Sequence, residues 1–268
     1  GKPFISVPTA PSVDGFTSKG APLLIRGEKL TVQAIGPQAI FADTDILASA
    51  PMPMIAAGFG DMLGKWTSLF DWKFGSLTAG EPYDPFVARI TERALGSCVE
   101  QADAIGRRTE EGVHALAWAL IESGLAMLIF GQSHPASGAE HHLSHYWEMA
   151  FIRAGRRQLL HGAKVGVACT LIAGLYRQIG EEGLPGAPEG ALADAARKHA
   201  AARWPEIRAL IQALPTANEL RDWLGAVHGP TTIESLGIEA ELADRALAEA
   251  HRVRPGRHTL LRAYNESR

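Results

Sequence analysis

The spacing of hydrophobic residues changes once along the chain, near residue 46. Before that point, short runs of β-branched and aliphatic residues are separated by turns rich in Gly, Pro, Ser and Thr. Such runs are typical of β-strands. They predict a short buried strand at residues 4–7, a hairpin that joins 23–25 to 30–34 across a turn at 26–29, and a further strand at 38–42.

From residue 46 onward, apolar residues recur at helical spacing and are interrupted by Pro and Gly. Thr109, followed by two glutamates, indicates a helix N-terminus, and Ser137-x-x-Glu140 has the pattern of a capping box. The predicted helices lie at residues 54–70, 86–107, 109–130, 191–214, 217–227 and 238–252, with two more that begin near 137 and at 161. We therefore expect a mainly α fold, with a β-containing segment at residues 1–47 and a helical domain at 48–268.

Composition restricts the classes of function. The chain has 268 residues, of which 46% are hydrophobic, and a formal net charge of −3, so it lacks the basic surface that binds nucleic acid. Cys98 and Cys169 stand in apolar helical contexts and predict buried free thiols. No N-terminal segment resembles a signal peptide, and the apolar run at 115–130 contains Glu122 and is shorter than a bilayer requires. These features predict a cytoplasmic protein without a membrane partner.

Four of the ten histidines gather in one stretch. His141 and His145 are four residues apart and project from one face of a helix, whereas His161 opens a separate helix. Neutral imidazole is the commonest protein ligand of a transition metal, and an Asp with two His leaves coordination positions open, as a catalytic metal requires. Asp61 is the candidate oxygen ligand, so two helices must converge with a third to build the site. His142 is expected on another face, in contact with solvent.

Six motifs resemble one enzyme family in order and spacing. They are Ser6-Val-Pro-Thr-Ala-Pro-Ser-Val-Asp-Gly15, Ala42-Asp-Thr-Asp-Ile-Leu47, Ala56-Ala-Gly-Phe-Gly-Asp-Met-Leu-Gly-Lys65, Ser137-Gly-Ala-Glu-His-His-Leu-Ser-His145, Leu160-His-Gly-Ala-Lys-Val-Gly166 and His258-Thr-Leu-Leu261. The family is that of the bacterial sn-glycerol-1-phosphate dehydrogenases of the AraM type, with iron-containing alcohol dehydrogenases, glycerol dehydrogenases and dehydroquinate synthases as wider relatives. The resemblance implies the helical metal-binding domain of a dehydroquinate synthase-like fold, preceded by the end of an α/β nucleotide-binding domain.

The resemblance also implies roles for individual residues. Asp61, His141 and His161 would bind one divalent metal, for which Zn, Ni and Fe are all suitable. A glutamate stands at the first of these positions in dehydroquinate synthases, so Asp61 favours a dehydrogenase. His145 would contact the substrate or relay a proton, or else support the site structurally. The remaining candidates are contacts to the nicotinamide (Thr9, Ser12 and Ser18), to the substrate (Asp14, which ordinary turn chemistry also explains) and to the substrate phosphate (Lys65 and Lys164).

The implied reaction is hydride transfer between NAD or NADP and C2 of glycerol phosphate, which interconverts glycerol phosphate and dihydroxyacetone phosphate. Its implied setting is a homodimer that serves phospholipid biosynthesis. A Gly-rich turn for the cofactor pyrophosphate is missing, because Gly58-x-Gly60-x-x-x-Gly64-Lys65 has neither the dinucleotide nor the P-loop spacing.

We therefore expect a fragment, or a derivative that lost most of its cofactor domain. Such a chain would be poorly active alone, since the pyrophosphate lacks a helix N-terminus on which to bind. Two alternatives remain open: a metal-assisted hydrolase or lyase, and a non-catalytic helical module that binds a partner.

Overall fold

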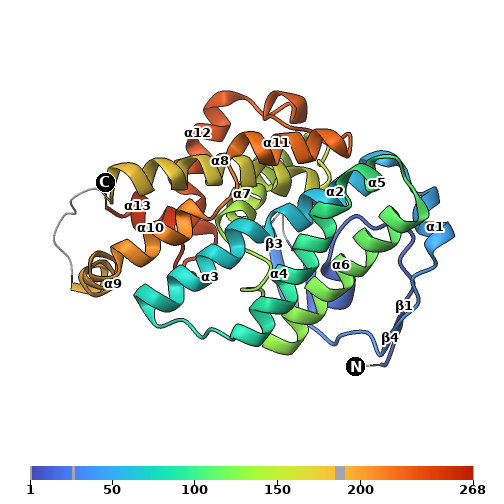
Figure 1. Cartoon of the computed structure of the whole chain (residues 1–268), viewed down its shortest axis with the longest axis horizontal. Coiled ribbons are helices and arrows are strands. Elements are labelled where there is room, and N and C mark those ends of the chain that lie inside the picture. The colour runs from blue at the N-terminus through green and yellow to red at the C-terminus, as the bar shows by residue number, and fades with distance from the viewer. Residues whose placement is uncertain (1, 26–27, 185–190, 268) are drawn as a thin grey trace.

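The computed structural model describes residues 2–25, 28–184 and 191–267, and most of the chain is α-helical (Figure 1). The strands are β1 (Ile5–Ser6), β2 (Gly20–Ile25), β3 (Glu28–Gln33) and β4 (Ala39–Ile40). The helices are α1 (Thr44–Ser49), α2 (Met52–Leu63), α3 (Lys65–Ala79), α4 (Pro85–Glu100), α5 (Ala102–Gly106), α6 (Glu110–Phe130), α7 (Ala139–Arg153), α8 (His161–Glu182), α9 (Ala191–Ala202), α10 (Trp204–Gln212), α11 (Ala217–Ala226), α12 (Ala240–Glu249) and α13 (Leu260–Asn265). Short 3-10 helices are η1 (Gly15–Thr17), η2 (Glu234–Leu236) and η3 (Ala250–Val253). The prediction of a mainly α fold is confirmed.

The described strands form two separate two-stranded sheets. β2 pairs antiparallel with β3, with Leu23 opposite Leu30, which confirms the predicted hairpin. Two residues of its turn, 26–27, lie outside the described residues. The predicted boundary between two parts of the chain, after residue 47, falls inside α1 and remains a prediction.

The strand predicted at residues 4–7 exists in shorter form but is not buried. β1 pairs in parallel with β4 over two residues, which also makes β4 shorter than the predicted strand at 38–42. Phe4, Ile5 and Val7 are 46%, 56% and 58% exposed. The prediction of a buried strand is wrong because a two-stranded sheet leaves these side chains uncovered.

Helix α8 lies at the centre of the helical part, and most of its residues are buried. Buried side chains of α8 join two apolar clusters. The first includes Trp147 and Tyr176 with residues of α3, α10 and α12, and the second includes Phe59 and Leu95 with residues of α6 and α11. A helix that is apolar on nearly all sides is stable only when it is surrounded in this way. The two free cysteines are buried, as predicted.

Glycines allow α2 and α8 to approach each other backbone to backbone. A Cβ atom added at Gly60 would lie 2.4 Å from the carbonyl oxygen of Gly162, and one added at Gly162 would lie 1.8 Å from the carbonyl oxygen of Ala57. Both distances are far below a van der Waals contact, so only glycine fits at this crossing. The close approach brings Asp61, the residue after Gly60, opposite His161, the residue before Gly162.

Three predicted helices are each divided in two. Residues 54–70 contain a break at Gly64, residues 86–107 a break at Gln101, and residues 191–214 a break at Arg203. A Cβ atom at Gly64 would lie 2.5 Å from Cγ1 of Val165, so this break lets α8 pack closely. The helical spacing of apolar residues continues across each of these breaks, so the sequence pattern did not indicate where one helix ends and the next begins.

One of the two predicted caps is confirmed. The side chain of Thr109 accepts a hydrogen bond from the backbone N–H of Gly112 at the start of α6. The capping box at Ser137 is wrong, because Gly138 is the N-cap of α7 and Oγ of Ser137 accepts a hydrogen bond from Arg254 instead.

Helix α6 matches the helix predicted at 109–130 and extends beyond the apolar run at 115–130. It has 21 residues and a mean hydropathy of 1.8, and it is the one helix in the described part of the chain that is long and apolar enough to cross a membrane. It also carries Glu122, paired with Arg93 at 2.6 Å, and packs along one side against α2, α4, α5 and η1. Core helices of globular domains share this length and composition.

Candidate metal and substrate site

Asp61, His141 and His161 lie together although they come from three helices. Asp61 is near the end of α2, His141 is in the first turn of α7, and His161 begins α8. One donor atom from each residue lies within 4.8 Å of the other two. Oδ1 of Asp61 is 3.6 Å from Nε2 of His141, and the rings of His141 and His161 are 5.2 Å apart between centroids. One carboxylate and two imidazoles in this arrangement fit a divalent transition metal with open coordination positions.

Glu140 fixes the orientation of His141. Its Oε1 lies 2.7 Å from Nδ1 of His141, so Nδ1 carries a hydrogen and Nε2 is the nitrogen that faces Asp61. The carboxylate of Glu140 is fully buried and also accepts from the hydroxyl of Thr67 and the backbone N–H of Gly138. Burial alone would raise the pKa of Glu140, but these donors outweigh it and lower the pKa. A carboxylate behind a histidine is the usual partner of a metal-ligating imidazole.

Lys65 joins the carboxylates of Asp61 and Asp14. Its Nζ lies 3.0 Å from Oδ1 of Asp61 and 2.8 Å from Oδ2 of Asp14, and it also donates to the carbonyl oxygen of Ala136. Burial opposes the charge of Asp61, but Lys65 and the nearby histidines outweigh it and hold the pKa of Asp61 well below its usual range. The two carboxylates likewise outweigh burial and raise the pKa of Lys65. This corrects the expected phosphate contact, because the ammonium of Lys65 is fully buried against these partners.

The segment before β2 carries Asp14 into the site. The backbone N–H of Asp14 donates to Oδ2 of Asp61 at 3.0 Å, and the hydroxyl of Ser123 donates to the Asp14 carboxylate at 2.8 Å. This segment lies directly on α2 and α6, because a Cβ atom at Gly58 would overlap the carbonyl oxygen of Pro11 and one at Gly124 would lie 2.6 Å from the carbonyl oxygen of Asp14. Asp14 is therefore held over the end of α2 rather than at the tip of a free turn.

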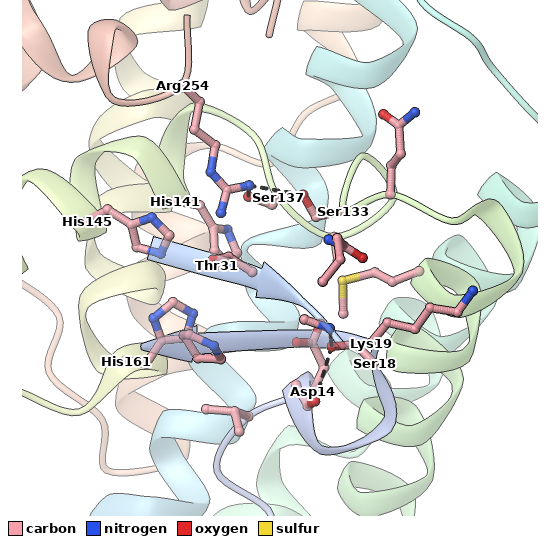
Figure 2. Close-up of a pocket in the computed structure, with 18 of the residues that line it drawn as sticks. Asp14, Ser18, Lys19, Thr31, Ser133, Ser137, His141, His145, His161 and Arg254 are labelled. Carbon is pink, nitrogen blue, oxygen red and sulfur yellow. Dashed lines mark hydrogen bonds between the residues drawn. The ribbon is translucent and has the colours of Figure 1, made fainter. Parts of the chain in front are cut away.

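A cavity of about 560 Å³ lies over these residues (Figure 2). Its walls come from the segment around Asp14, the β2–β3 hairpin, the end of α6 and the following loop, the first turns of α7 and α8, and the end of η3. His141, His145 and His161 line it together with Asp14 and Ser18. Asp61 is fully buried beneath them. The arrangement is a cavity whose floor can hold an ion and whose opening can admit a small substrate.

The other residues singled out from the sequence lie in different surroundings. Ser18 lines the cavity, whereas Thr9 is exposed and Ser12 half-buried in the segment that leads to Asp14. Their contacts to a nicotinamide remain predictions. Lys164 is 2% exposed and its Nζ lies 3.1 Å from Glu148, so it does not line the cavity, which corrects its expected contact to a phosphate.

His145 faces the cavity beside the other two histidines. Its ring centroid is 6.2 Å from that of His141 and 5.8 Å from that of His161. His145, Glu148 and His161 also form a second set of donor atoms within 4.8 Å of one another. Its position suits both a contact to a substrate and support of His161, so the two roles expected from the sequence remain open.

His142 is buried, contrary to the expectation of a solvated side chain. It is 1% exposed, in a helix against which α3, α8, α12 and η3 all pack. Burial, with a smaller contribution from the positive charge of Arg254, lowers the pKa of His142 to about 3. The imidazole is therefore neutral inside the protein at neutral pH.

Comparison with known proteins gives the relationships of the chain. A family model described as iron-containing alcohol dehydrogenase matches residues 1–51. The chain is 51% identical to a glycerol-1-phosphate dehydrogenase [NAD(P)+] of Geobacillus stearothermophilus over 98% of the chain and 66% of that protein. It is 34% identical to the protein of the same name from Methanosarcina mazei, over 97% of the chain and 61% of that protein.

Solved structures show the same fold. A glycerol dehydrogenase from Schizosaccharomyces pombe superimposes with a TM-score of 0.62 at 21% identity, over 98% of the chain and 59% of that structure. A probable glycerol dehydrogenase from Sinorhizobium meliloti 1021 gives a TM-score of 0.65 at 17% identity, over 99% of the chain and 68% of that structure.

The chain therefore spans a little under two thirds of the length of the first of these relatives. The match to this relative runs along 98% of the chain, strands included. The expected resemblance to glycerol-1-phosphate dehydrogenases is confirmed. Over nearly its whole length the chain is similar to glycerol-1-phosphate dehydrogenases, and over residues 1–51 it matches the iron-containing alcohol dehydrogenase family.

Proposed function

We propose that the chain catalyses the NAD(P)-linked, metal-dependent interconversion of dihydroxyacetone phosphate and sn-glycerol 1-phosphate. The observation that carries the proposal is the set formed by Asp61, His141 and His161 at the floor of the cavity, with Glu140 behind His141. The name shared by the relatives, glycerol-1-phosphate dehydrogenase [NAD(P)+], supports the reaction type and the cofactor.

Asp61, His141 and His161 would hold a divalent ion, for which Zn, Ni and Fe are all suitable. Such an ion, when bound, acts as a Lewis acid on the oxygen at C2 of the substrate. Lys65 keeps the carboxylate of Asp61 ionised and therefore ready to bind a cation. Glu140 holds Nε2 of His141 toward the same point. The buried charges of Asp61, Asp14 and Lys65 sum to −1, which favours a cation above them.

In the direction of reduction, the C2 carbonyl of dihydroxyacetone phosphate receives a hydride at carbon and a proton at oxygen. His145 lines the cavity one helical turn after His141 and is placed to deliver that proton. Asp14 lies on the opposite wall, where Ser123 and Lys65 fix its carboxylate, and can orient a substrate hydroxyl. Ser18, with Thr9 and Ser12 before it, would contact the nicotinamide next to the substrate.

The test is turnover by the purified chain after loading with Zn²⁺, Ni²⁺ or Fe²⁺, followed as oxidation of NADH or NADPH by dihydroxyacetone phosphate. His161→Ala should lower kcat about a hundredfold or more. The matched control is His114→Ala, at an exposed position of α6. Turnover that resists chelators, or equal rates in both variants, would contradict the proposal. Hydrolysis of phosphoesters without NAD(P) would favour the metal-assisted hydrolase instead.

A further inference from the structure

Arg254 points into the cavity from the wall formed after η3 (Figure 2). Its Nη1 donates to the hydroxyl oxygens of Ser133 and Ser137, at 3.0 and 3.4 Å. Both serines belong to the loop between α6 and α7 and line the same cavity. Because each serine accepts from Arg254, its own O–H hydrogen remains to donate to a ligand.

Arg254 differs from the neighbouring Arg257 in its partners. Arg257 lies 3.7 Å from Glu81 and donates to the carbonyl oxygen of Ser137. Within residues 2–25, 28–184 and 191–267, no carboxylate lies within ion-pair distance of Arg254. Burial and the positive charge of Arg257 lower the pKa of Arg254 and outweigh a smaller opposing effect of Glu140, so the charge of Arg254 is poorly solvated. A bound anion would offset that cost.

The other basic residues near the site are placed differently. Lys65 is bound to Asp61 and Asp14, and Lys164 is paired with Glu148, so both of these ammonium groups are buried against carboxylates. Lys19 lines the cavity but is exposed on the segment between η1 and β2. Arg254 is therefore the basic residue on the side of the cavity where α7 carries His141 and His145 (Figure 2).

We propose that Arg254, with the hydroxyls of Ser133 and Ser137, binds the phosphate group of a phosphate monoester in this cavity. A guanidinium presents parallel N–H donors that match two phosphate oxygens, and the two hydroxyls add donors beside it. The inference rests on the proposed function for the identity of the monoester. The pyrophosphate of NAD(P) has the same chemistry, so the experiment must separate the two sources.

The experiment is a calorimetric titration of the metal-loaded chain with sn-glycerol 1-phosphate, glycerol, inorganic phosphate and NADH in separate runs. Arg254→Gln should raise the Kd for sn-glycerol 1-phosphate and for inorganic phosphate about ten- to a hundredfold. The Kd values for glycerol and NADH should stay unchanged. The matched control, Arg252→Gln, removes an exposed arginine of η3 and should leave all four values unchanged.

A second variant keeps the test valid if Arg254→Gln does not fold. Ser133→Ala combined with Ser137→Ala retains the arginine and should raise the Kd for sn-glycerol 1-phosphate about five- to fiftyfold. Unchanged affinity for sn-glycerol 1-phosphate in the folded variants, absence of its binding to the wild type, or a loss confined to NADH would each overturn the inference.

The two proposals can fail separately. A wild type that binds sn-glycerol 1-phosphate through Arg254 but does not oxidise it with NAD(P)⁺ would retain the binding site and refute the proposed function. If Arg254→Gln oxidised sn-glycerol 1-phosphate normally and with an unchanged KM, the proposed function would stand and the phosphate site at Arg254 would be refuted.

Discussion

The carboxylate of Glu140 lies 2.7 Å from Nδ1 of His141, and its other contacts, with Thr67 and Gly138, hold it in place. His141 therefore cannot turn its ring without leaving a buried carboxylate short of a partner. The orientation of His141, a proposed metal ligand, is therefore set by the protein before any ion binds.

Glu140→Gln should weaken metal binding while keeping the size of the side chain. The amide oxygen can still accept a hydrogen bond from Nδ1–H of His141, but the amide lacks the negative charge of the carboxylate. We therefore expect the Kd for Zn²⁺ to rise about ten- to a hundredfold. Competition with a chromophoric chelator measures it. Glu92→Gln, at an exposed position of α4, is the control. Equal affinities would show that Glu140 has only a structural role.

Gly162→Ala should separate α2 from α8. The added methyl group would lie 1.8 Å from the carbonyl oxygen of Ala57, and moving the helices apart should lower the free energy of unfolding by about 1–3 kcal/mol. Urea denaturation measures the change. Gly96→Ala is the control, because no atom lies within 4 Å of the new methyl group and alanine is the better helix former by about 1 kcal/mol. If both variants were equally stable, the tight crossing would be refuted.

Lys65→Met should make the stability of the chain depend on metal. Removal of the ammonium leaves Asp61 and Asp14 buried without their cation, which should cost about 3–5 kcal/mol in the metal-free protein. A divalent ion bound at Asp61 would restore part of that loss, so Zn²⁺ should raise the Tm of Lys65→Met more than that of the wild type. Lys198→Met, at an exposed position, should behave like the wild type. The same Zn²⁺-induced shift in Lys65→Met and the wild type would refute this coupling.

The buried His142 should lower the free energy of unfolding at acid pH. Its pKa is about 3 in the folded protein and about 6.5 in the unfolded chain, so the unfolded chain binds the proton first as the pH falls. The stability contributed by neutral His142 is present above pH 6.5 and declines toward pH 3, by about 5 kcal/mol at most.

His142→Leu should remove this part of the decline. Both ring nitrogens lack a partner among the described residues, so the variant should also be at least as stable as the wild type at pH 7. Denaturation at pH 7 and pH 4 measures both effects, with the exposed His114→Leu as control. A decline in His142→Leu equal to that of the wild type would contradict the buried neutral state.

The sequence predicted the parts of the site that depend on motifs and helical spacing. Asp61, His141 and His161 stand in distinct motifs, and the expectation that their helices converge agrees with donor atoms within 4.8 Å. The hairpin and the start of α6 at Thr109 followed from turn and capping chemistry. These features are local, so a short window of residues contains the information.

The remaining features depend on contacts between distant parts of the chain. Lys65 is buried next to Asp14, which comes from another segment and lies 2.8 Å away, and His142 is buried in a helix against which α3, α8, α12 and η3 pack. The sequence pattern indicated that Glu140 caps a helix, whereas its carboxylate contacts His141. Its position directly before His141 was the one feature of the sequence that pointed to this contact. Arg254 approaches Ser137 across 117 positions, which no periodicity reveals.

The complete burial of Asp61 beneath two histidines has a consequence for ion exchange. An ion bound at Asp61 would reach solvent through the cavity that His141 and His161 line, where the substrate is also proposed to bind. A phosphorylated alcohol bound in the cavity would then block the route of the ion to solvent. Saturating sn-glycerol 1-phosphate should slow the extraction of zinc by a chelator, so that the substrate protects the centre that activates it.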